Sequence, residues 1–375
     1  MAADIYERLA QHLDSLPAGY PRTDSGVEIR ILRRLFTPED AELALHLALL
    51  SEPARVIAHR AKIPVEEATR RLQEMERKGL VYVSHQEGKE PEYMATQWVI
   101  GIYEFQVNRL APELVHDVEE YGPTWFNQSA WDKAPQLRTI PVGESINAQV
   151  EVMPYEQAEA MVHTHDQLAV APCICRKEKQ IAGEGCDKPL ETCLMMGEAA
   201  AYYVHNGFGR PIDQEEALTI LAQAEEKALV LQPSNSKNSD NICMCCGCCC
   251  GILTNIKRQP MPASIVASAF VAALDAETCV GCGTCEDRCQ MEAIRMEDGK
   301  AALNLDRCIG CGLCVTTCPT DSLRLLRKPK AEQPYVPKNS VDANIRIGHA
   351  RGKLNAGKLV SMLVKSKLDR LLAPR

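Results

Sequence analysis

The sequence lacks several features that would assign the chain to common classes of protein. No apolar run reaches the length of about eighteen residues that a membrane-spanning helix needs. The best candidate, residues 263–274, is short and rich in small residues, so we expect a buried segment there. Residues 1–30 show no basic segment followed by an apolar run and a small-residue cleavage site. We therefore expect no signal peptide and a cytoplasmic protein.

Motifs for nucleotide-dependent or hydrolytic chemistry are also missing. The chain contains no Walker loop, no GxSxG and no HExxH, and Gly207-Phe-Gly209 is too short for a dinucleotide fingerprint. A flavin or nicotinamide site would therefore have to lie on a partner protein. The formal net charge of −8 argues against generic nucleic-acid binding.

Cysteine, by contrast, is abundant. The chain has 18 cysteines in 375 residues, whereas its 46% apolar and 25% charged residues are ordinary for a soluble protein. Without an export signal, so many cysteines indicate thiolate ligands in a reducing compartment and not a disulfide framework. A chain of this length is expected to form two or three domains.

Eight of the cysteines form two copies of the motif C-x2-C-x2-C-x3-C, which is the ligand spacing of paired [4Fe–4S] clusters. The first copy comprises Cys279, Cys282, Cys285 and Cys289, and the second comprises Cys308, Cys311, Cys314 and Cys318. Three closely spaced thiolates can hold three corners of a cube, and the fourth corner is reached from further along the chain. Zinc also binds C-x2-C pairs but rarely uses three cysteines at this spacing twice over, so we favour iron–sulfur clusters.

Four glycines lie between the cysteines of the two motifs and should let the backbone turn tightly, with its N–H groups toward the cluster sulfurs. They are Gly281, Gly283, Gly310 and Gly312.

The segment resembles the bacterial two-cluster ferredoxins, and Pro319 follows its last cysteine as in that family. In the family, the fourth cysteine of each motif ligates the other cluster. The resemblance therefore implies one cluster on Cys279, Cys282, Cys285 and Cys318 and a second on Cys308, Cys311, Cys314 and Cys289. Gln290 stands where the family has a proline, so we expect a different turn there without loss of a ligand.

The other ten cysteines form two sets in the preceding region. The first set is Cys173, Cys175, Cys186 and Cys193, and the second is Cys243, Cys245, Cys246, Cys248, Cys249 and Cys250. Adjacent cysteines point their side chains apart, so we expect only alternate members of the second set to converge, and some to join the first set. The first set alone would complete one tetrathiolate site. Free structural thiols are the alternative, although unligated thiols at this density would be prone to oxidation.

The order of these motifs, Cys-x-Cys-Arg followed by Cys-x-Cys-Cys-Gly-Cys-Cys-Cys, resembles a group of larger iron–sulfur proteins of anaerobes. In that group a cysteine-rich domain precedes a two-cluster ferredoxin domain. One or more additional iron–sulfur clusters are therefore expected. Arg176 is a predicted cofactor-binding residue, since it could donate hydrogen bonds to a cluster sulfide or to its bound ligand.

The first ninety residues resemble a winged-helix domain, with helices expected over 41–50, 53–61 and 65–78 and a hairpin after Gly79. The third helix would direct Arg70, Arg71, Gln73 and Arg77 outward, as a DNA-reading helix does. However, residues 1–90 hold thirteen Lys and Arg against fifteen Asp and Glu, which makes this domain a poor candidate for phosphate binding.

The end of the chain is basic, with eleven Lys and Arg against three Asp and Glu in residues 328–375. Leu359, Leu363 and Leu368 recur at roughly helical spacing among lysines. Such a helix could contact a membrane surface or a partner's groove, or it could pack on the body of the protein.

Together these features predict a multidomain α+β protein. We expect a winged-helix-like domain at 1–95, a connecting region at 96–165, and a cysteine-rich domain with a further iron–sulfur site at 166–262. A 2[4Fe–4S] ferredoxin domain at 263–327 and a basic tail with a terminal helix at 328–375 complete the chain.

The predicted function is single-electron transfer with redox partner proteins, as a module or subunit of an anaerobic oxidoreductase system. One alternative is a transcription regulator that senses redox state or oxygen and uses the winged helix. Another is a reductase with an open-site cluster in the middle domain.

Overall fold

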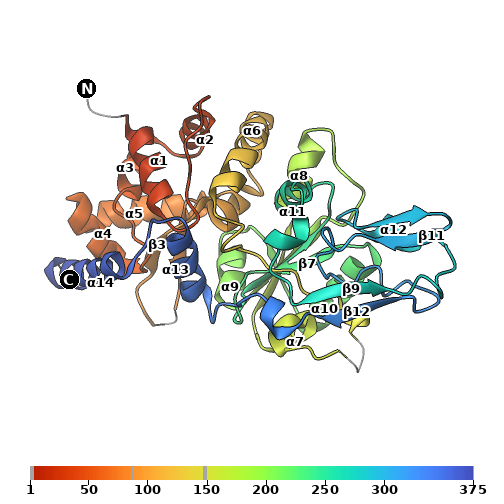
Figure 1. Cartoon of the computed structure of the whole chain (residues 1–375). Helices are drawn as coiled ribbons and strands as arrows, with labels where there is room; N and C mark the ends of the chain where they lie inside the picture. Colours follow the sequence, from red (N-terminus) through yellow and green to blue (C-terminus); the bar gives the residue numbers. More distant parts are fainter. Residues whose placement is uncertain (1–3, 87, 147–149, 375) are drawn as a thin grey trace. The chain divides into compact units, whose positions relative to one another are not determined.

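The computed structural model describes residues 4–86, 88–146 and 150–374, and the chain forms two compact units (Figure 1). Unit 1 contains residues 1–130, 205–208 and 344–375, and unit 2 contains residues 131–204 and 209–343. Small parts of the predicted ranges 1–95, 96–165 and 328–375 lie outside the described residues.

Unit 1 is mainly helical. Its helices are α1 (Ile5–Ser15), α2 (Val27–Leu35), α3 (Pro38–Ala44), α4 (Ala54–Ala61), α5 (Val65–Arg77), α6 (Pro112–Gln128) and α14 (Ala356–Leu372). A small antiparallel sheet of order β1-β3-β2 comprises β1 (Glu52–Pro53), β2 (Val81–Ser84) and β3 (Glu92–Ala95). Two irregular turns follow at Trp98–Ile102 and Glu104–Gln106. The helix α13 (Ser340–Ala350) begins in unit 2 and ends in unit 1.

The apolar stripe of the third predicted helix packs into the core of unit 1. In α5, Ala68, Leu72 and Met75 are fully buried, and Gly79 ends the segment with a φ of 68°. This is the left-handed conformation that glycine adopts without a Cβ penalty after a helix.

The helix predicted over 41–50 is displaced in the structure. The helix α3 begins three residues earlier because Thr37 and Asp40 form a reciprocal capping box and Pro38 occupies the first turn. It ends at Ala44, and the chain turns before Leu47, which is still buried. The apolar spacing of Leu43 and Leu47 was therefore a property of the core and not of one continuous helix.

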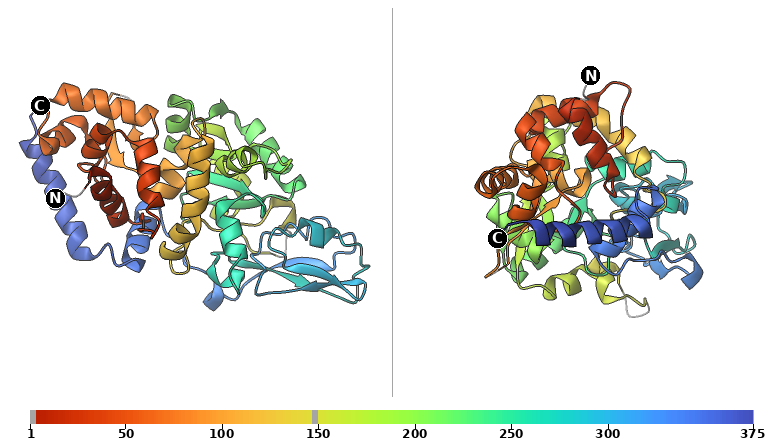
Figure 2. Two further views of the ribbon diagram at one scale, coloured as in Figure 1. Left: turned by 90° about the horizontal axis from the view of Figure 1, so that it is seen from above. Right: turned by 90° about the vertical axis from the view of Figure 1, so that its left-hand side faces the viewer.

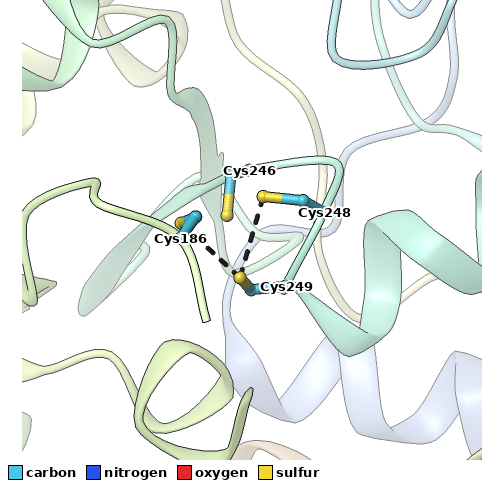
Figure 3. Close-up of side chains that lie close together, drawn as sticks. All are labelled: Cys186, Cys246, Cys248 and Cys249. Carbon is cyan, nitrogen blue, oxygen red and sulfur yellow. Dashed lines mark hydrogen bonds between the residues drawn. The ribbon is translucent and has the colours of Figure 1, made fainter. Parts of the chain in front are cut away.

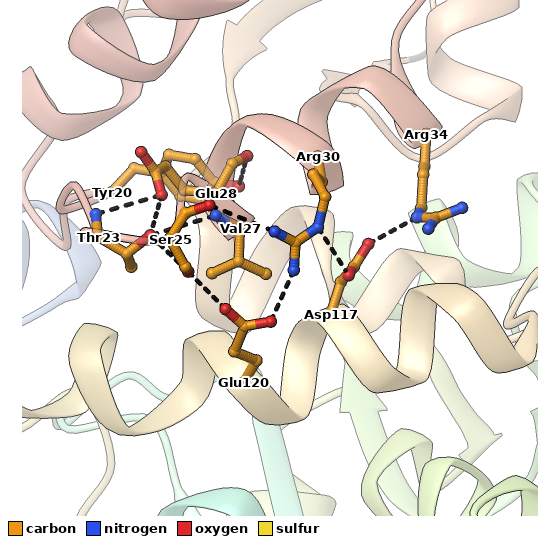
Figure 4. A network of polar contacts seen from close by, with 9 residues as sticks. All are labelled: Tyr20, Thr23, Ser25, Val27, Glu28, Arg30, Arg34, Asp117 and Glu120. Atoms are coloured by element: carbon orange, nitrogen blue, oxygen red, sulfur yellow. Dashed lines mark hydrogen bonds and ion pairs between the residues drawn. The ribbon is translucent and has the colours of Figure 1, made fainter.

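A buried carboxylate joins α2 to α6 (Figure 4). Asp117 on α6 is 2% exposed and forms ion pairs with the Nε atoms of Arg30, at 3.2 Å, and of Arg34, at 2.6 Å. Arg30 also donates to Glu120 at 2.6 Å. Because a buried charge is costly unless it is paired, these contacts fix the register of the two helices.

The predicted terminal helix exists as α14, which lies against α4 (Figure 2). Ser366 is its buried residue and donates to Glu52 at 2.6 Å, and Asp369 pairs with Arg60. The opposite side of the helix exposes an apolar stripe with Val364 and Leu368, and Leu363 beside this stripe is also about half exposed. Contact of this stripe with a partner or a membrane stays a prediction.

Unit 2 is built on a five-stranded antiparallel sheet of order β6-β4-β5-β8-β7 (Figure 1). Its strands are β4 (Leu168–Pro172), β5 (Glu191–Met196), β6 (Arg210–Ile212), β7 (Val230–Pro233) and β8 (Asn241–Cys245). Its helices are α7 (Ala158–His163), α8 (Ile174–Ile181), α9 (Glu198–His205), α10 (Gln214–Glu226) and α11 (Gly251–Lys257), and short turns lie at Gly143–Ser145, Pro154–Glu156 and Pro262–Ile265. The helix α10 contacts β4 and β5. Asp213 caps this helix by accepting from the N–H of Glu216 at 2.8 Å.

The last part of unit 2 consists of two short antiparallel pairs around a helical turn. One pair is β9 (Phe270–Leu274) with β12 (Leu323–Arg327), and the other is β10 (Ile294–Glu297) with β11 (Lys300–Leu303). The short helix α12 (Thr284–Arg288) lies between them in sequence, and a final turn spans Lys330–Glu332. Apolar residues of all four strands pack together with six of the eight motif cysteines in one core.

Among the described residues, no helix has both the length and the apolar character that a membrane span requires.

Candidate iron–sulfur sites

The first predicted ligand set of the ferredoxin-like segment lines a single cavity in unit 2. Cys279, Cys282, Cys285 and Cys318 all contribute to its wall, although Cys318 belongs to the second motif. Backbone N–H groups donate hydrogen bonds to the sulfurs; for example, the N–H of Ala301 donates to Sγ of Cys279 at 3.5 Å. Burial raises the pKa of Cys318, but hydrogen bonds from the N–H groups after it outweigh burial and lower that pKa. These features fit a ligand set for a cluster that prefers thiolates.

The second predicted ligand set also comes together. Burial raises the pKa of Cys308, Cys311 and Cys314, that of Cys311 to about 12, and the nearby Cys289 raises all three further. The N–H of Ala272 donates to Cys308 at 3.4 Å, and that of Ala293 donates to Cys289 at 3.1 Å. Three shielded thiols with raised pKa values are costly to ionise together, and a bound metal cluster removes that cost.

The motif glycines adopt the left-handed conformation expected of them. The φ angles are 74° at Gly281, 82° at Gly283, 68° at Gly310 and 78° at Gly312. At two of these positions space is also limiting. A Cβ at Gly281 would collide with the carbonyl of Gly299, and one at Gly310 with the carbonyl of Phe270. The motif therefore needs glycine for both backbone conformation and close approach to the neighbouring strands.

Gln290, which replaces the proline of the ferredoxin pattern, connects the two cysteine regions. Its Oε1 accepts a hydrogen bond from the N–H of Gly247 at 2.7 Å, and Gly247 lies between Cys246 and Cys248. A Cβ at Gly247 would collide with the carbonyl of Gln290. The turn after Cys289 is thus held against the second cysteine-rich block by a hydrogen bond that a proline side chain could not form.

Six of the other ten cysteines form a ring of neighbouring thiols, which we call the six-cysteine ring. Around the ring each thiol lies next to the following one in the order Cys173, Cys175, Cys250, Cys245, Cys243, Cys193 and back to Cys173. The pKa values alternate along it, because hydrogen bonds from both neighbours lower the pKa of Cys173, Cys250 and Cys243, the last to about 5. The same hydrogen bonds raise the pKa of Cys175, Cys245 and Cys193.

Regular secondary structure positions the ring. Cys243 and Cys245 lie two residues apart on β8 and so share one face of the sheet. Cys193 on β5 is the register partner of Cys243. Cys173 follows β4 and is the N-cap residue of α8, whose first turn carries Cys175, and Cys250 is the N-cap residue of α11. The thiols therefore project from strands and helix starts, which hold their directions closely.

The remaining four cysteines form a second group, the four-cysteine set of Cys186, Cys246, Cys248 and Cys249 (Figure 3). All four sulfurs lie within 4.8 Å of one another. The Sγ of Cys249 is 3.5 Å from that of Cys186 and 3.7 Å from that of Cys248. Four convergent thiols supply the number of protein ligands that a tetrahedral metal ion or one [4Fe–4S] cluster needs.

This partition differs from the sequence-based expectation in two ways. Cys186 does not join Cys173, Cys175 and Cys193 in one tetrathiolate set but faces the second block. In addition, the neighbours Cys248 and Cys249 converge, although adjacent side chains were expected to diverge. That expectation holds for extended chain, whereas residues 247–249 form a turn. The expectation of divergence does hold for the adjacent pairs Cys245–Cys246 and Cys249–Cys250. In each pair one cysteine belongs to the six-cysteine ring and the other to the four-cysteine set.

Arg176, the predicted cofactor-binding residue, is fully buried beside both groups. Its guanidinium donates to the carbonyls of Pro189, at 2.6 Å, and Met244, at 2.7 Å. Burial by itself would lower the pKa of Arg176, but the nearby Cys173 and Cys246 raise it. The arginine thus places a fixed positive charge beside both thiol groups, where thiolates or a cluster would be negative.

A further group in unit 1 was not foreseen from the sequence. Glu76, His85 and His205 bring three ligand-type atoms within 4.8 Å of one another. The Nε2 of His85 lies 2.7 Å from Oε1 of Glu76, which also accepts from Asn206 at 3.4 Å. Hydrogen bonds account for this buried carboxylate, so we assign it no further role.

Comparison with known families supports the iron–sulfur interpretation. Residues 272–325 match the family described as 4Fe-4S dicluster domain. Searches of curated proteins and of solved structures found no match. The matched segment contains both C-x2-C-x2-C-x3-C motifs, the strands β10 and β11, and parts of β9 and β12. The chain therefore carries a 4Fe-4S ferredoxin-like domain, which supports a role in iron–sulfur electron transfer.

Proposed function

We propose that the protein relays single electrons through two [4Fe–4S] clusters in residues 279–318 and at least one further iron–sulfur site in residues 173–250. When bound, such clusters supply one-electron chemistry by cycling between two oxidation levels. In this proposal the first cluster is held by Cys279, Cys282, Cys285 and Cys318, and the second by Cys308, Cys311, Cys314 and Cys289. The shared cavity and the grouped thiols described above support this cross-ligation.

The main support for this relay is the hydrogen bond between Gly247 and Gln290. It joins the backbone between two cysteines of the four-cysteine set to the side chain that follows Cys289, a ligand of the second cluster. Arg288 adds contacts nearby, since it donates to the carbonyl of Leu313 at 2.9 Å and to that of Glu225 at 2.7 Å. Two redox sites in one compact unit, joined by a hydrogen bond, can exchange electrons without a docking step.

The N-terminal helices then serve as a contact region for a redox partner in an oxidoreductase system of an anaerobe. The arrangement of α4, α5 and the β2–β3 hairpin supports the winged-helix proposal. Two of its three predicted DNA-facing arginines, however, are engaged on their own helix, because Arg70 pairs with Glu74 at 2.8 Å and Arg71 pairs with Glu67. Protein contact is therefore favoured over DNA binding, which requires free cations for phosphate.

Metal analysis of anaerobically purified full-length protein tests this function. The ferredoxin-like domain alone accounts for about eight irons per chain, and occupancy of the middle region raises the count to about twelve or more. An iron count near four, or zinc in place of iron, would overturn the proposal.

A further inference from the structure

The ten cysteines of the middle region belong to two sites of different character. The four-cysteine set reaches the surface, because Cys248 is exposed. The six-cysteine ring is more enclosed, and Cys173, Cys245 and Cys250 are only 4–7% exposed. The two sites are separated at the peptide bonds 245–246 and 249–250, where neighbouring side chains turn in opposite directions. No thiol is shared between them among those that the structure describes.

Ligand counting distinguishes the ring from an ordinary cubane site. Each iron of a [4Fe–4S] cluster binds three sulfides and one protein ligand, so four thiolates complete it. The ring offers six thiols, and each of them has two ring neighbours. A cubane would leave two thiols of the ring without a ligand role beside an anionic cluster, where they would be costly to ionise.

The positions of the six thiols are also fixed by the fold. Three of them lie on or opposite β8, and the other three lie at the starts of α8 and α11, so none depends on a long loop. A ligand set held by strands and helix starts is preorganised for one arrangement of metal ions. The buried guanidinium of Arg176 beside the ring offsets part of the negative charge that six thiolates bring.

We propose that the six ring cysteines act as one ligand set and hold a single iron–sulfur cluster with more irons than a cubane. This inference rests on the proposed function, because it specifies the cluster of the middle region. The four-cysteine set is a separate site with four ligands.

Single serine substitutions test the proposal in the full chain, purified without oxygen. We expect each of the six variants C173S, C175S, C193S, C243S, C245S and C250S to lose the same Mössbauer component, while the ferredoxin signals persist. Met244→Leu serves as the matched control, because Met244 is equally buried between two ring cysteines but carries no thiol. Cys248→Ser should remove a different component. If two ring variants kept the full component, the ring would hold a cubane and the inference would be wrong.

Native mass spectrometry of the wild-type chain provides a second test that does not depend on the folding of variants. With both middle sites filled with iron, the proposal predicts more than about sixteen irons per chain, since three cubanes account for about twelve and the ring for more than four. If the four-cysteine set holds one zinc, the expected count is more than about twelve. A total that leaves four irons for the ring would contradict the six-ligand cluster alone. Two zinc ions in the ring would likewise contradict it. Iron limited to about eight would overturn the proposed function as well.

Discussion

The two cysteine-rich parts of unit 2 position their thiols in different ways. In residues 279–318 the sulfurs are set by tight turns, in which left-handed glycines such as Gly281 and Gly310 let the chain fold around a cavity. In residues 173–250 they are set by the pairing of β5 with β8 and by helix starts that are distant in sequence. The first kind of site is encoded locally and twice over, while the second exists only after the sheet has formed. The following experiments test this difference.

Loss of the ligand that one motif contributes to the other cluster should have the largest effect. Cys289→Ala is expected to remove the cluster held mainly by Cys308, Cys311 and Cys314, so that about four irons per chain are lost. Iron analysis with electron paramagnetic resonance would measure this change. Loss of the cluster on Cys279 instead, with the other cluster intact, would show that the cross-ligation is wrong.

Substitution in the four-cysteine set should be nearly as severe but confined to the middle region. Cys249→Ser removes the sulfur that contacts both Cys186 and Cys248, and we expect loss of the metal of that set. The ferredoxin-like domain should keep its full iron content because its ligands come from other elements. Metal analysis before and after the substitution measures the effect, and parallel loss from both regions would contradict their independence.

The helical unit should respond to a different substitution without any effect on metal content. Asp117→Ala leaves Arg30 and Arg34 without their shared buried carboxylate, and we expect a loss of about 2 kcal/mol in unfolding free energy. Both arginines are about 40% exposed, so solvent keeps the loss below that of a fully buried pair. Denaturation followed by circular dichroism, with iron absorbance as a second signal, separates the two units. Glu113→Ala, on an exposed position of the same helix, is the matched control. An unchanged stability would show that this ion pair does not hold α2 to α6.

The link between the two cysteine regions should matter for electron exchange more than for stability. Gln290→Ala removes the acceptor for the N–H of Gly247, which costs about 1 kcal/mol. We expect all clusters to be retained but electron exchange between the regions to become several-fold slower in flash-reduction measurements. Gln290→Glu, which keeps the acceptor, should behave like the wild type. Equal rates in all three proteins would mean that electrons take another route.

A pH dependence of stability should arise beside the six-cysteine ring. Burial raises the pKa of Glu178 to about 7. The acid form is therefore favoured in the folded protein, and stability declines as the pH rises from the unfolded pKa near 4.5 through 7. Glu178→Gln should remove this decline, so its stability relative to the wild type should increase between pH 5 and 8. A constant difference across that range would exclude ionisation of Glu178 as the cause.

The features that the sequence predicted correctly depend on residues that lie close together along the chain. The repeated motif and its glycines indicated the ferredoxin-like domain, and Gly79 marked a helix end that the structure confirms. The sequence did not predict the position of α3, because a capping box at Thr37 and Asp40 outweighed the apolar spacing of the following leucines.

The partition of the ten middle cysteines was also beyond reach, since it depends on which strand lies opposite Cys243 and on a turn at 247–249. The two-residue spacing of Cys243 and Cys245, which places both side chains on one face of a strand, was a local signal for the ring. Cys186 gave no such signal, because its loop is brought to the second block by tertiary contacts. The winged-helix assignment and the five-part domain division stay predictions.

The proposed relay requires that the middle region add redox capacity to that of the ferredoxin-like domain. Anaerobic coulometric titration of the full chain counts the electrons that it accepts. Two cubanes take about two electrons, so the account predicts more than two per chain, with at least one couple lost in Cys249→Ser or in a ring variant. Uptake of two electrons or fewer, unchanged by those substitutions, would contradict it.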